Sequence, residues 1–406
     1  MDTITHGIAG ALVGKAFFAG RGGEQQYAGL KPGATTAGEN AGLKAGATGR
    51  VAIWAATLGG IFPDSDSLLG LFDANGMAVI SSHSGATHSF LLLPLWALAL
   101  AALTRWFCRR REIVCPSFAA LTGIYAAGIA LHIFLDLITS FGTMIWAPAN
   151  YARVSWDLVF IIDFALTATV LLPQAAAWVY RERIALPLRA LFAWGLFSLA
   201  AFGVQWLARR MELPHSPWMT FVVALLLAAL FFAPMVRGWG CRVSRRAWCR
   251  AGVVIFAAYL GACFFANRAA LRFVEDYAVR ENLRVDAIAA IPLPPSLLYW
   301  SGLVRTPDGV HFATIRLFAA RGPKFGFTGD AADNLYIAAA RRLPAVQSYL
   351  RFARFPVVRF VERGGINVVE FADLRFFGRT RRGPEPFTFR VTLDSAGHVL
   401  SSGWAE

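Results

Sequence analysis

Apolar residues along this chain are gathered into long runs that short polar loops separate. Six of the runs approach the roughly 20 residues that an α-helix needs to cross the hydrocarbon core of a bilayer. Their length predicts a bundle of membrane-spanning helices. They cover residues 89–107, 118–139, 158–180, 187–207, 218–236 and 251–267.

Two shorter apolar runs, residues 6–20 and 51–62, precede the six. Both are marginal as spans, so we expect short or re-entrant helices that neighbouring helices cover. Residues 22–49 lie between them and are rich in Gly, Ala and Thr. That composition is typical of a flexible loop.

Beyond residue 267 the long runs give way to alternating polar and apolar residues, as in strands with one buried face. Turn sequences such as Asp308-Gly309 and Gly364-Gly365 separate the alternating segments and predict three hairpins. A helix interrupted by Pro344 is expected within residues 333–352. The hairpins pair residues 298–306 with 310–318, 357–362 with 366–371, and 387–393 with 399–404.

The predicted fold is therefore an α-helical polytopic membrane domain, residues 1–267, followed by a C-terminal extramembrane α+β domain, residues 268–406. Composition agrees, because 56% of the 406 residues are hydrophobic and only 16% are charged. Soluble domains are about 25% charged. The mean hydropathy of +0.50 points the same way. We expect a multi-pass membrane protein with lipids as partners.

The net charge of +14 comes largely from short arginine clusters between apolar runs. The loops after the first, third and fifth long runs hold four, three and five arginines, against three in the alternate loops. The positive-inside rule places the arginine-rich loops in the cytoplasm and the C-terminal domain outside. No basic and aromatic nucleic-acid motif is present, so we expect no nucleic-acid partner. The five cysteines form no C-x-x-C pair and predict no disulfide framework.

Ionisable residues gather at the ends of the apolar runs, all on the predicted outer side. A charge at the bilayer centre costs about 2.5–3.5 kcal/mol on insertion scales, so such residues require an explanation. They are Asp64, Asp66, His83, His88, His132, Asp136, Asp157 and Asp163.

Asp and His are the ligands of hydrolytic metal ions. His132 and Asp136 share one helix face, because residues four apart are neighbours. Asp64 and Asp66 lie two residues apart at a turn. Each motif also has a structural explanation, such as an intrahelical hydrogen bond or solvated acids that end a helix. Their common position at one face favours a divalent-metal site, with zinc as the first expectation.

Three functions follow from these residues. A metal site would activate water and polarise an ester or phosphoryl oxygen, and a leftover acid would act as general base. A metal-independent lipid phosphatase can also use His-x-x-x-Asp, but it needs a basic cluster that the residues before His132 lack. The third is a non-enzymatic membrane scaffold or regulator. A serine hydrolase is disfavoured, because no G-x-S-x-G motif is present.

Over about residues 1–165 the chain resembles a family of bacterial inner-membrane metal-dependent hydrolases, also described as LexA-binding. One departure is Ser84, where the family tends to have Arg. The motifs that carry the resemblance are Met1-Asp-Thr-Ile-Thr-His6-Gly, Gly60-Ile-Phe-Pro-Asp64-Ser-Asp66, His83-Ser-Gly-Ala-Thr-His88-Ser, His132-x-x-x-Asp136-Leu-Ile-Thr-Ser-Phe-Gly-Thr143, and Asp157 with Asp163.

The resemblance implies a hydrolase that acts at the outer face of the inner membrane, on a lipid or envelope ester or phosphoester. It also supports His6, which no spacing singles out. The implied metal ligands are His6, Asp64, His88, His132 and Asp136, with Asp66, His83 and Asp157 nearby as the catalytic residues. The later segments Leu350-Arg-Phe-Ala-Arg-Phe-Pro356 and Phe371-Ala-Asp-Leu-Arg375 are similar to longer members of the family.

Overall fold

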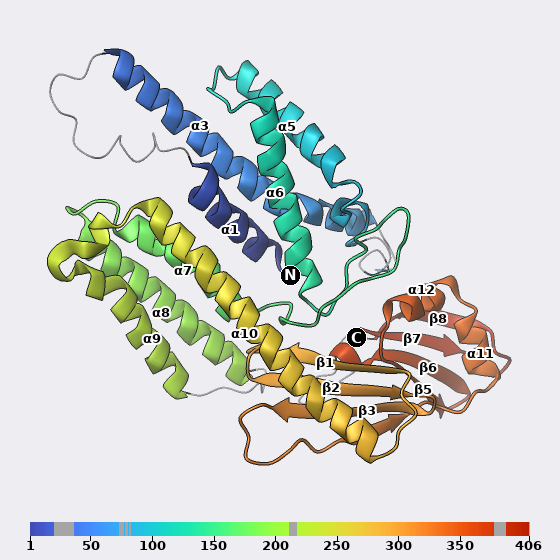
Figure 1. The fold of residues 1–406 in the computed structure, drawn as a ribbon. Coiled ribbons are helices and arrows are strands. Elements are labelled where there is room, and N and C mark those ends of the chain that lie inside the picture. The colour runs from blue at the N-terminus through green and yellow to red at the C-terminus, as the bar shows by residue number, and fades with distance from the viewer. Residues whose placement is uncertain are drawn as a thin grey trace.

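In a computed structural model of the protein, residues 1–19, 36–72, 77, 80, 83–210, 217–376 and 387–405 are described. A mostly helical N-terminal region leads into a C-terminal region of two antiparallel sheets (Figure 1). The predicted fold class, a polytopic helical membrane domain followed by an α+β domain, is confirmed.

Four helical segments of the described residues are long and apolar enough to cross a membrane. They are α6 (Phe118–Leu137), α8 (Leu186–Arg210), the segment Trp218–Arg242, and α10 (Arg245–Arg280). The segment Trp218–Arg242 contains most of α9 (Pro217–Phe232) and the 3-10 helix η4 (Ala233–Arg242).

Two of the six predicted spans form shorter helices, α5 (Leu93–Arg110) and α7 (Phe164–Val179). The run expected at 158–180 begins late because Asp163 caps α7. Its Oδ1 atom accepts hydrogen bonds from the amides of Ala165 and Leu166 at 2.8 and 3.1 Å. A capped first turn satisfies backbone donors that would otherwise have no partner.

The two short N-terminal runs are helical and pack against α6. They form α1 (Thr3–Val13), which continues as the π-helix η1 (Gly14–Phe18), and the second half of α3 (Thr36–Ile61). Small residues let the three backbones approach closely, as in many membrane helix pairs. A Cβ on Gly10 of α1 would lie 2.5 Å from the Ala56 carbonyl oxygen, and one on Gly128 of α6 would lie 2.8 Å from the same atom.

The structure differs from the loop expected at residues 22–49. Residues 20–35 lie outside the described residues, but α3 begins at Thr36, so residues 36–49 are helical. This stretch contains Ala, Leu, Glu and Lys, which are good helix formers. Because a helix propagates more easily than it nucleates, the apolar helix that follows can extend back through the intervening glycines.

The C-terminal region contains two four-stranded antiparallel sheets, each with its strands in sequence order. All six strands of the three predicted hairpins are present, and β1 and β4 are additional. Pro344 divides the expected helix into α11 (Leu335–Arg341) and α12 (Pro344–Phe352). The strands are β1 (Ala287–Leu293), β2 (Tyr299–Thr306), β3 (Gly309–Arg316), β4 (Gly326–Gly329), β5 (Pro356–Arg363), β6 (Ile366–Asp373), β7 (Thr388–Leu393) and β8 (Val399–Trp404).

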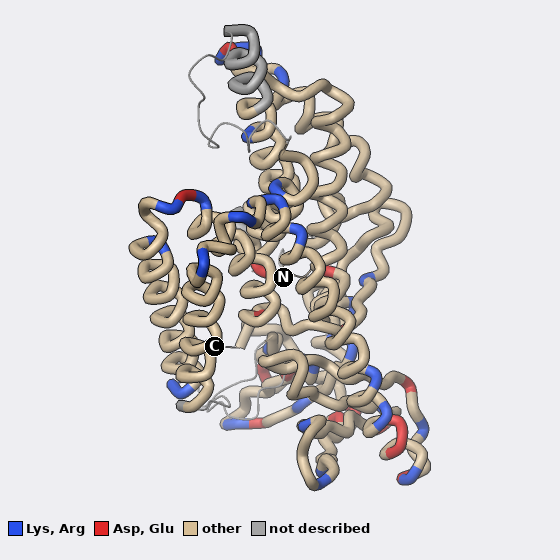
Figure 2. The backbone as a smooth tube through the Cα atoms, turned by 60° about the vertical axis from the view of Figure 1, so that its left-hand side comes forward, with Lys and Arg blue, Asp and Glu red and all other residues tan. Residues whose placement is uncertain are grey.

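Helix α10 joins the two regions, because it runs through the predicted boundary at residue 267 and ends at Arg280. Its last turns bury Ala270 and Val274 against Trp300 of the first sheet. The sheets lie at the end of the helical region where the N-terminus is also found (Figure 1). Lys and Arg gather at helix ends, and few charges lie along the helices (Figure 2).

Candidate metal centre

Four buried side chains from three segments converge where the helices meet the C-terminal region. Asp64 lies on the 3-10 helix η2 (Phe62–Phe72), which follows α3, and His88 ends the short 3-10 helix η3 (Ala86–His88). His132 and Asp136 lie one turn apart near the end of α6. One donor atom from each of the four lies within 4.8 Å of those of the other three.

The distances between donor atoms suit one small cation. His88 Nε2 lies 3.1 Å from His132 Nε2 and 3.2 Å from Asp136 Oδ2. His132 Nε2 lies 3.4 Å from both Asp64 Oδ1 and Asp136 Oδ2. His88 Nε2 and Asp64 Oδ1 are 3.7 Å apart. Bonds of about 2.0–2.1 Å in a tetrahedron place ligand atoms about 3.3 Å apart, so these distances are compatible with one shared metal ion.

The Nδ1 atoms of both histidines are engaged by acceptors. His132 Nδ1 donates to the Gly60 carbonyl at 2.7 Å, and His88 Nδ1 lies 3.0 Å from Thr87 Oγ1. Because Thr87 Oγ1 donates its own proton to Asp66, it accepts from His88. With Nδ1 engaged in this way, the Nε2 atoms of both rings face the carboxylates of Asp64 and Asp136. The four residue types and their spacing are those of a group that could hold a metal ion.

Asp66 lies behind this set and orients two histidines. Its carboxylate accepts from His83 Nδ1 at 2.7 Å and lies 3.3 Å from His88 Nδ1. The Ser84 amide and the Thr87 hydroxyl also donate to it. Burial alone would raise the pKa of Asp66, but hydrogen bonds from His83 and His88 outweigh burial and hold that pKa well below its ordinary value. Asp66 is therefore ionised at neutral pH.

His83 is the most exposed histidine of the group. Its side chain is 26% exposed, whereas the His88 and His132 side chains are fully buried. Its Nδ1 atom faces Asp66, so the ring lies beside the four converging donors with one side open to solvent.

His6 lies next to the four donors rather than among them. Its ring stacks on His132 with centroids 3.6 Å apart, and its Nε2 lies 3.2 Å from Asp136 Oδ1. The amino group of Met1 donates to the same oxygen. His6 Nδ1 is buried and has no hydrogen-bond partner among the described residues. His6 therefore contacts the site through Asp136 and His132.

The two remaining aspartates point elsewhere. Asp157 accepts hydrogen bonds from the Arg354 guanidinium at 2.8 and 2.9 Å, so its carboxylate links the helical region to the C-terminal domain. Asp163 caps α7, and its other oxygen accepts from Tyr259 at 2.6 Å. The structure thus gathers seven of the eight predicted metal and catalytic residues and places Asp157 in a domain contact.

The residue patterns did not identify three groups that hold the site. Thr3 donates to Asp64 Oδ2 at 2.6 Å, and the carbonyl of Gly60 holds His132. Both belong to segments that carry the resemblance, which was the available signal. Arg153 donates to the His83 carbonyl at 3.0 Å, and no motif pointed to it.

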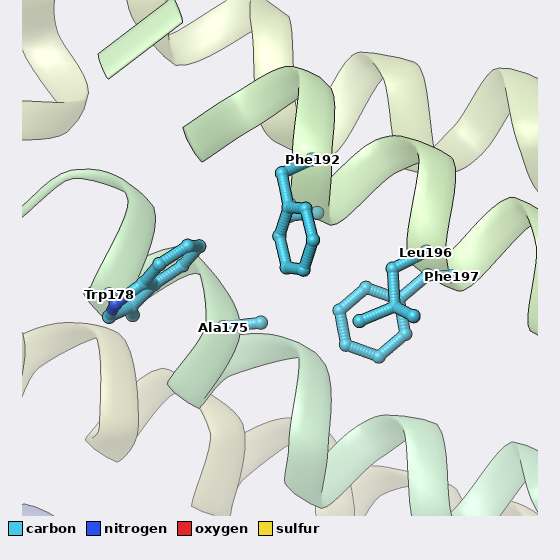
Figure 3. Close-up of a pocket in the computed structure, with 6 residues that line it drawn as sticks. Ala175, Trp178, Phe192, Leu196 and Phe197 are labelled. Carbon is cyan, nitrogen blue, oxygen red and sulfur yellow. The ribbon is translucent and has the colours of Figure 1, made fainter. Parts of the chain in front are cut away.

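An apolar crevice lies between α7 and α8, away from these residues. Ala175 and Trp178 line one side, and Phe192, Leu196 and Phe197 line the other (Figure 3). None of these side chains bears a titratable or metal-binding group. The crevice therefore offers space for an apolar chain but no chemistry of its own.

No curated protein and no solved structure matches this chain. The family model described as YdjM inner membrane protein matches residues 1–211. The match covers just over half of the chain and includes all four converging donors. With several apolar helices present, it establishes a multi-pass protein of the inner membrane. The chain therefore belongs to the YdjM inner membrane protein family.

Proposed function

We propose that this protein is a divalent-metal-dependent hydrolase of the inner membrane. The observation that carries the proposal is the convergence of Asp64, His88, His132 and Asp136, whose donor atoms lie within 4.8 Å of one another. Two carboxylates and two imidazole lone pairs buried together are costly without a cation. Their mixed nitrogen and oxygen chemistry favours zinc.

The four residues would hold the ion, which when bound supplies Lewis-acid chemistry for hydrolysis. His6 supports the site by stacking on His132 and by its contact with Asp136. His83 acts as the proton acceptor, because Asp66 fixes its Nδ1 proton and leaves Nε2 available. Asp157 has Arg354 as its partner, so we assign it no proton transfer.

The proposed site lies at the outer face of the membrane. Arg246 and Arg250 donate to the carbonyls of Ala19 and Ala16, near the end of the α1 and η1 segment that is remote from His6. The positive-inside rule places such arginines in the cytoplasm. A site at the opposite surface suits an ester or phosphoester of a lipid or envelope component, with membrane lipids rather than nucleic acid as partners.

Two alternatives are less well supported. A metal-independent phosphatase needs free cationic groups for phosphate, but the Arg153 guanidinium donates to three backbone carbonyls. A non-enzymatic scaffold explains a polar bundle core. It does not explain why donor atoms of two histidines and two aspartates converge within 4.8 Å of one another.

Metal analysis of protein purified in detergent tests the proposal. We expect about one zinc or other divalent ion per chain, and its loss in His132→Ala. His311→Ala, which changes a histidine of the C-terminal domain, is the matched control. Zinc-loaded protein should hydrolyse chromogenic carboxylic esters, chromogenic phosphoesters, or phospholipids in nanodiscs. Protein that binds no divalent ion even after reconstitution would favour the scaffold.

A further inference from the structure

Arg153 ties together three segments around the proposed site. Its guanidinium donates to the carbonyls of Gly142 at 2.7 Å, Ile80 at 2.8 Å and His83 at 3.0 Å. Hydrogen bonds from a charged donor are stronger than neutral ones, and a planar guanidinium can serve several acceptors in fixed directions. Arg153 therefore fixes the main chain of His83, whose ring bonds Asp66.

The C-terminal domain holds Arg153 from its other side. The guanidinium carbon lies 5.5 Å from the ring of Phe141 and 5.4 Å from that of Phe352 at the end of α12. Both distances fall within the range of cation–π attraction. Arg375 lies 4.6 Å from the Phe352 ring, so this ring contacts two guanidinium groups. Burial first, and then the charge of Arg375, lower the pKa of Arg153 to about 10.

Arg375 is itself anchored to both regions. Its Nε donates to Asp373 at 2.8 Å within the domain, and one terminal nitrogen donates to the Ser140 carbonyl at 2.8 Å. Ser140 lies just beyond α6, which carries His132 and Asp136. Ile80 is also buried in the core formed by α11, α12 and the second sheet. Ile80, whose carbonyl Arg153 holds, is thus packed into the C-terminal domain.

We infer that the C-terminal domain completes the site, and that Phe352 and Arg153 are positioning residues that hold His83 against Asp66. The inference rests on the proposed function. It goes beyond that function because the domain lies outside the family match, which ends at residue 211. A continuous set of contacts runs from Asp373 through Arg375, Phe352, Arg153, His83 and Asp66 to His88.

Coupling between two parts of a protein is reciprocal, so an ion bound at the site must stabilise the docked domain. We would measure amide hydrogen exchange of the full chain in nanodiscs with and without Zn²⁺. Zinc should slow exchange both in the segment around His88 and in α12, the latter by about tenfold, which is within the usual range for coupled sites. Phe352→Leu should abolish the zinc-dependent protection of α12. The zinc-dependent protection around His88 should remain.

Two further variants separate positioning from simple loss of stability. Phe352→Tyr keeps a ring against both guanidinium groups and should retain zinc-dependent protection of α12. Arg153→Lys keeps the charge but cannot bond three carbonyls in one plane, so it should lose that protection. Arg390→Lys, at a partly exposed ion pair with Glu370 in the same domain, is the control and should behave like the wild type.

The possible results are distinguishable. Protection around His88 without protection of α12 in the wild type would overturn this inference and leave the proposed function standing. Equal α12 protection in Phe352→Leu would also overturn it. No zinc-dependent protection anywhere would overturn the proposed function, and this inference with it.

Discussion

At the scale of single residues, the buried set combines two carboxylates with two imidazoles whose Nδ1 protons are committed to acceptors. Asp136 is central, because Oδ2 lies within 3.4 Å of both Nε2 atoms and Oδ1 contacts His6. Its charge, rather than its shape, is what a divalent ion requires. Replacing the carboxylate with an amide therefore separates a metal site from a merely polar core.

We predict that Asp136→Asn loses the bound metal while the fold is retained. The amide keeps the size of the side chain and part of its hydrogen bonding, but it lacks the negative charge. Elemental analysis and thermal unfolding of the purified variant check this expectation, with Asp333→Asn, whose side chain is 76% exposed, as control. Unchanged metal content would contradict the metal site, because the ion would then be held without this carboxylate.

At the scale of elements, close backbone packing positions the ligand-bearing segments. Gly10 and Gly128 both meet the Ala56 carbonyl, so α1, α3 and α6 approach one another at a single level. This approach brings Asp64, just beyond α3, beside His132 on α6. A larger residue at either glycine would separate helices whose ends carry the site.

We predict that Gly10→Ala destabilises the protein by about 1–3 kcal/mol, the usual cost of overpacking. Its Cβ would lie 2.5 Å from a backbone oxygen, which cannot rotate away. Gly203→Ala on α8 is the matched control, since its Cβ would meet nothing within 4 Å. Thermal unfolding in detergent should separate the two variants. Equal melting temperatures would show that the close contact does not limit packing.

At the scale of the whole molecule, the C-terminal domain is fixed to the helical region by charged contacts as well as by α10. Arg354 and Asp157 form one of these contacts, and their side chains are 34% and 11% exposed. Because solvent screens part of this pair, it contributes little to the free energy of unfolding. Removing Arg354 nevertheless leaves the Asp157 carboxylate largely buried without its partner.

We predict that Arg354→Ala lowers the free energy of unfolding by about 1–3 kcal/mol, the cost of an unsatisfied buried group. Arg390→Ala breaks a more exposed pair with Glu370 and should cost less than about 1 kcal/mol. Chemical unfolding of both variants checks the difference. The prediction fails if Arg354→Ala costs no more than Arg390→Ala.

The orientation of the whole chain gives a further prediction. If the arginine-rich loops are cytoplasmic, the C-terminal domain and the proposed site lie outside. A phosphatase reporter fused after Glu406 should then be active, and a cytoplasmic fluorescent reporter at the same position should be dark. The opposite pair of results would invert the topology and place the site at the cytoplasmic face.

Local sequence was sufficient for the features that local physics controls. Apolar runs predicted helices of the membrane region, because a bilayer requires continuous apolar length with internal hydrogen bonds. Turn residues such as Asp308-Gly309 located the three hairpins. The spacing of His132 and Asp136 placed both side chains on one helix face. The loop predicted from the glycine content was wrong for residues 36–49. These residues are helical because α3 extends back through them.

Tertiary structure alone decided how the titratable residues divide their roles. Asp66 and Asp157 both lie near helix ends, yet one orients His83 and His88 while the other pairs with Arg354, 197 residues away. The contacts of Arg153 and Phe352 likewise join distant segments. No sequence pattern encodes such partners, because they depend on how helices and sheets pack in three dimensions. The sequence by itself determined which residues can bind a metal, and packing determined which donor atoms meet.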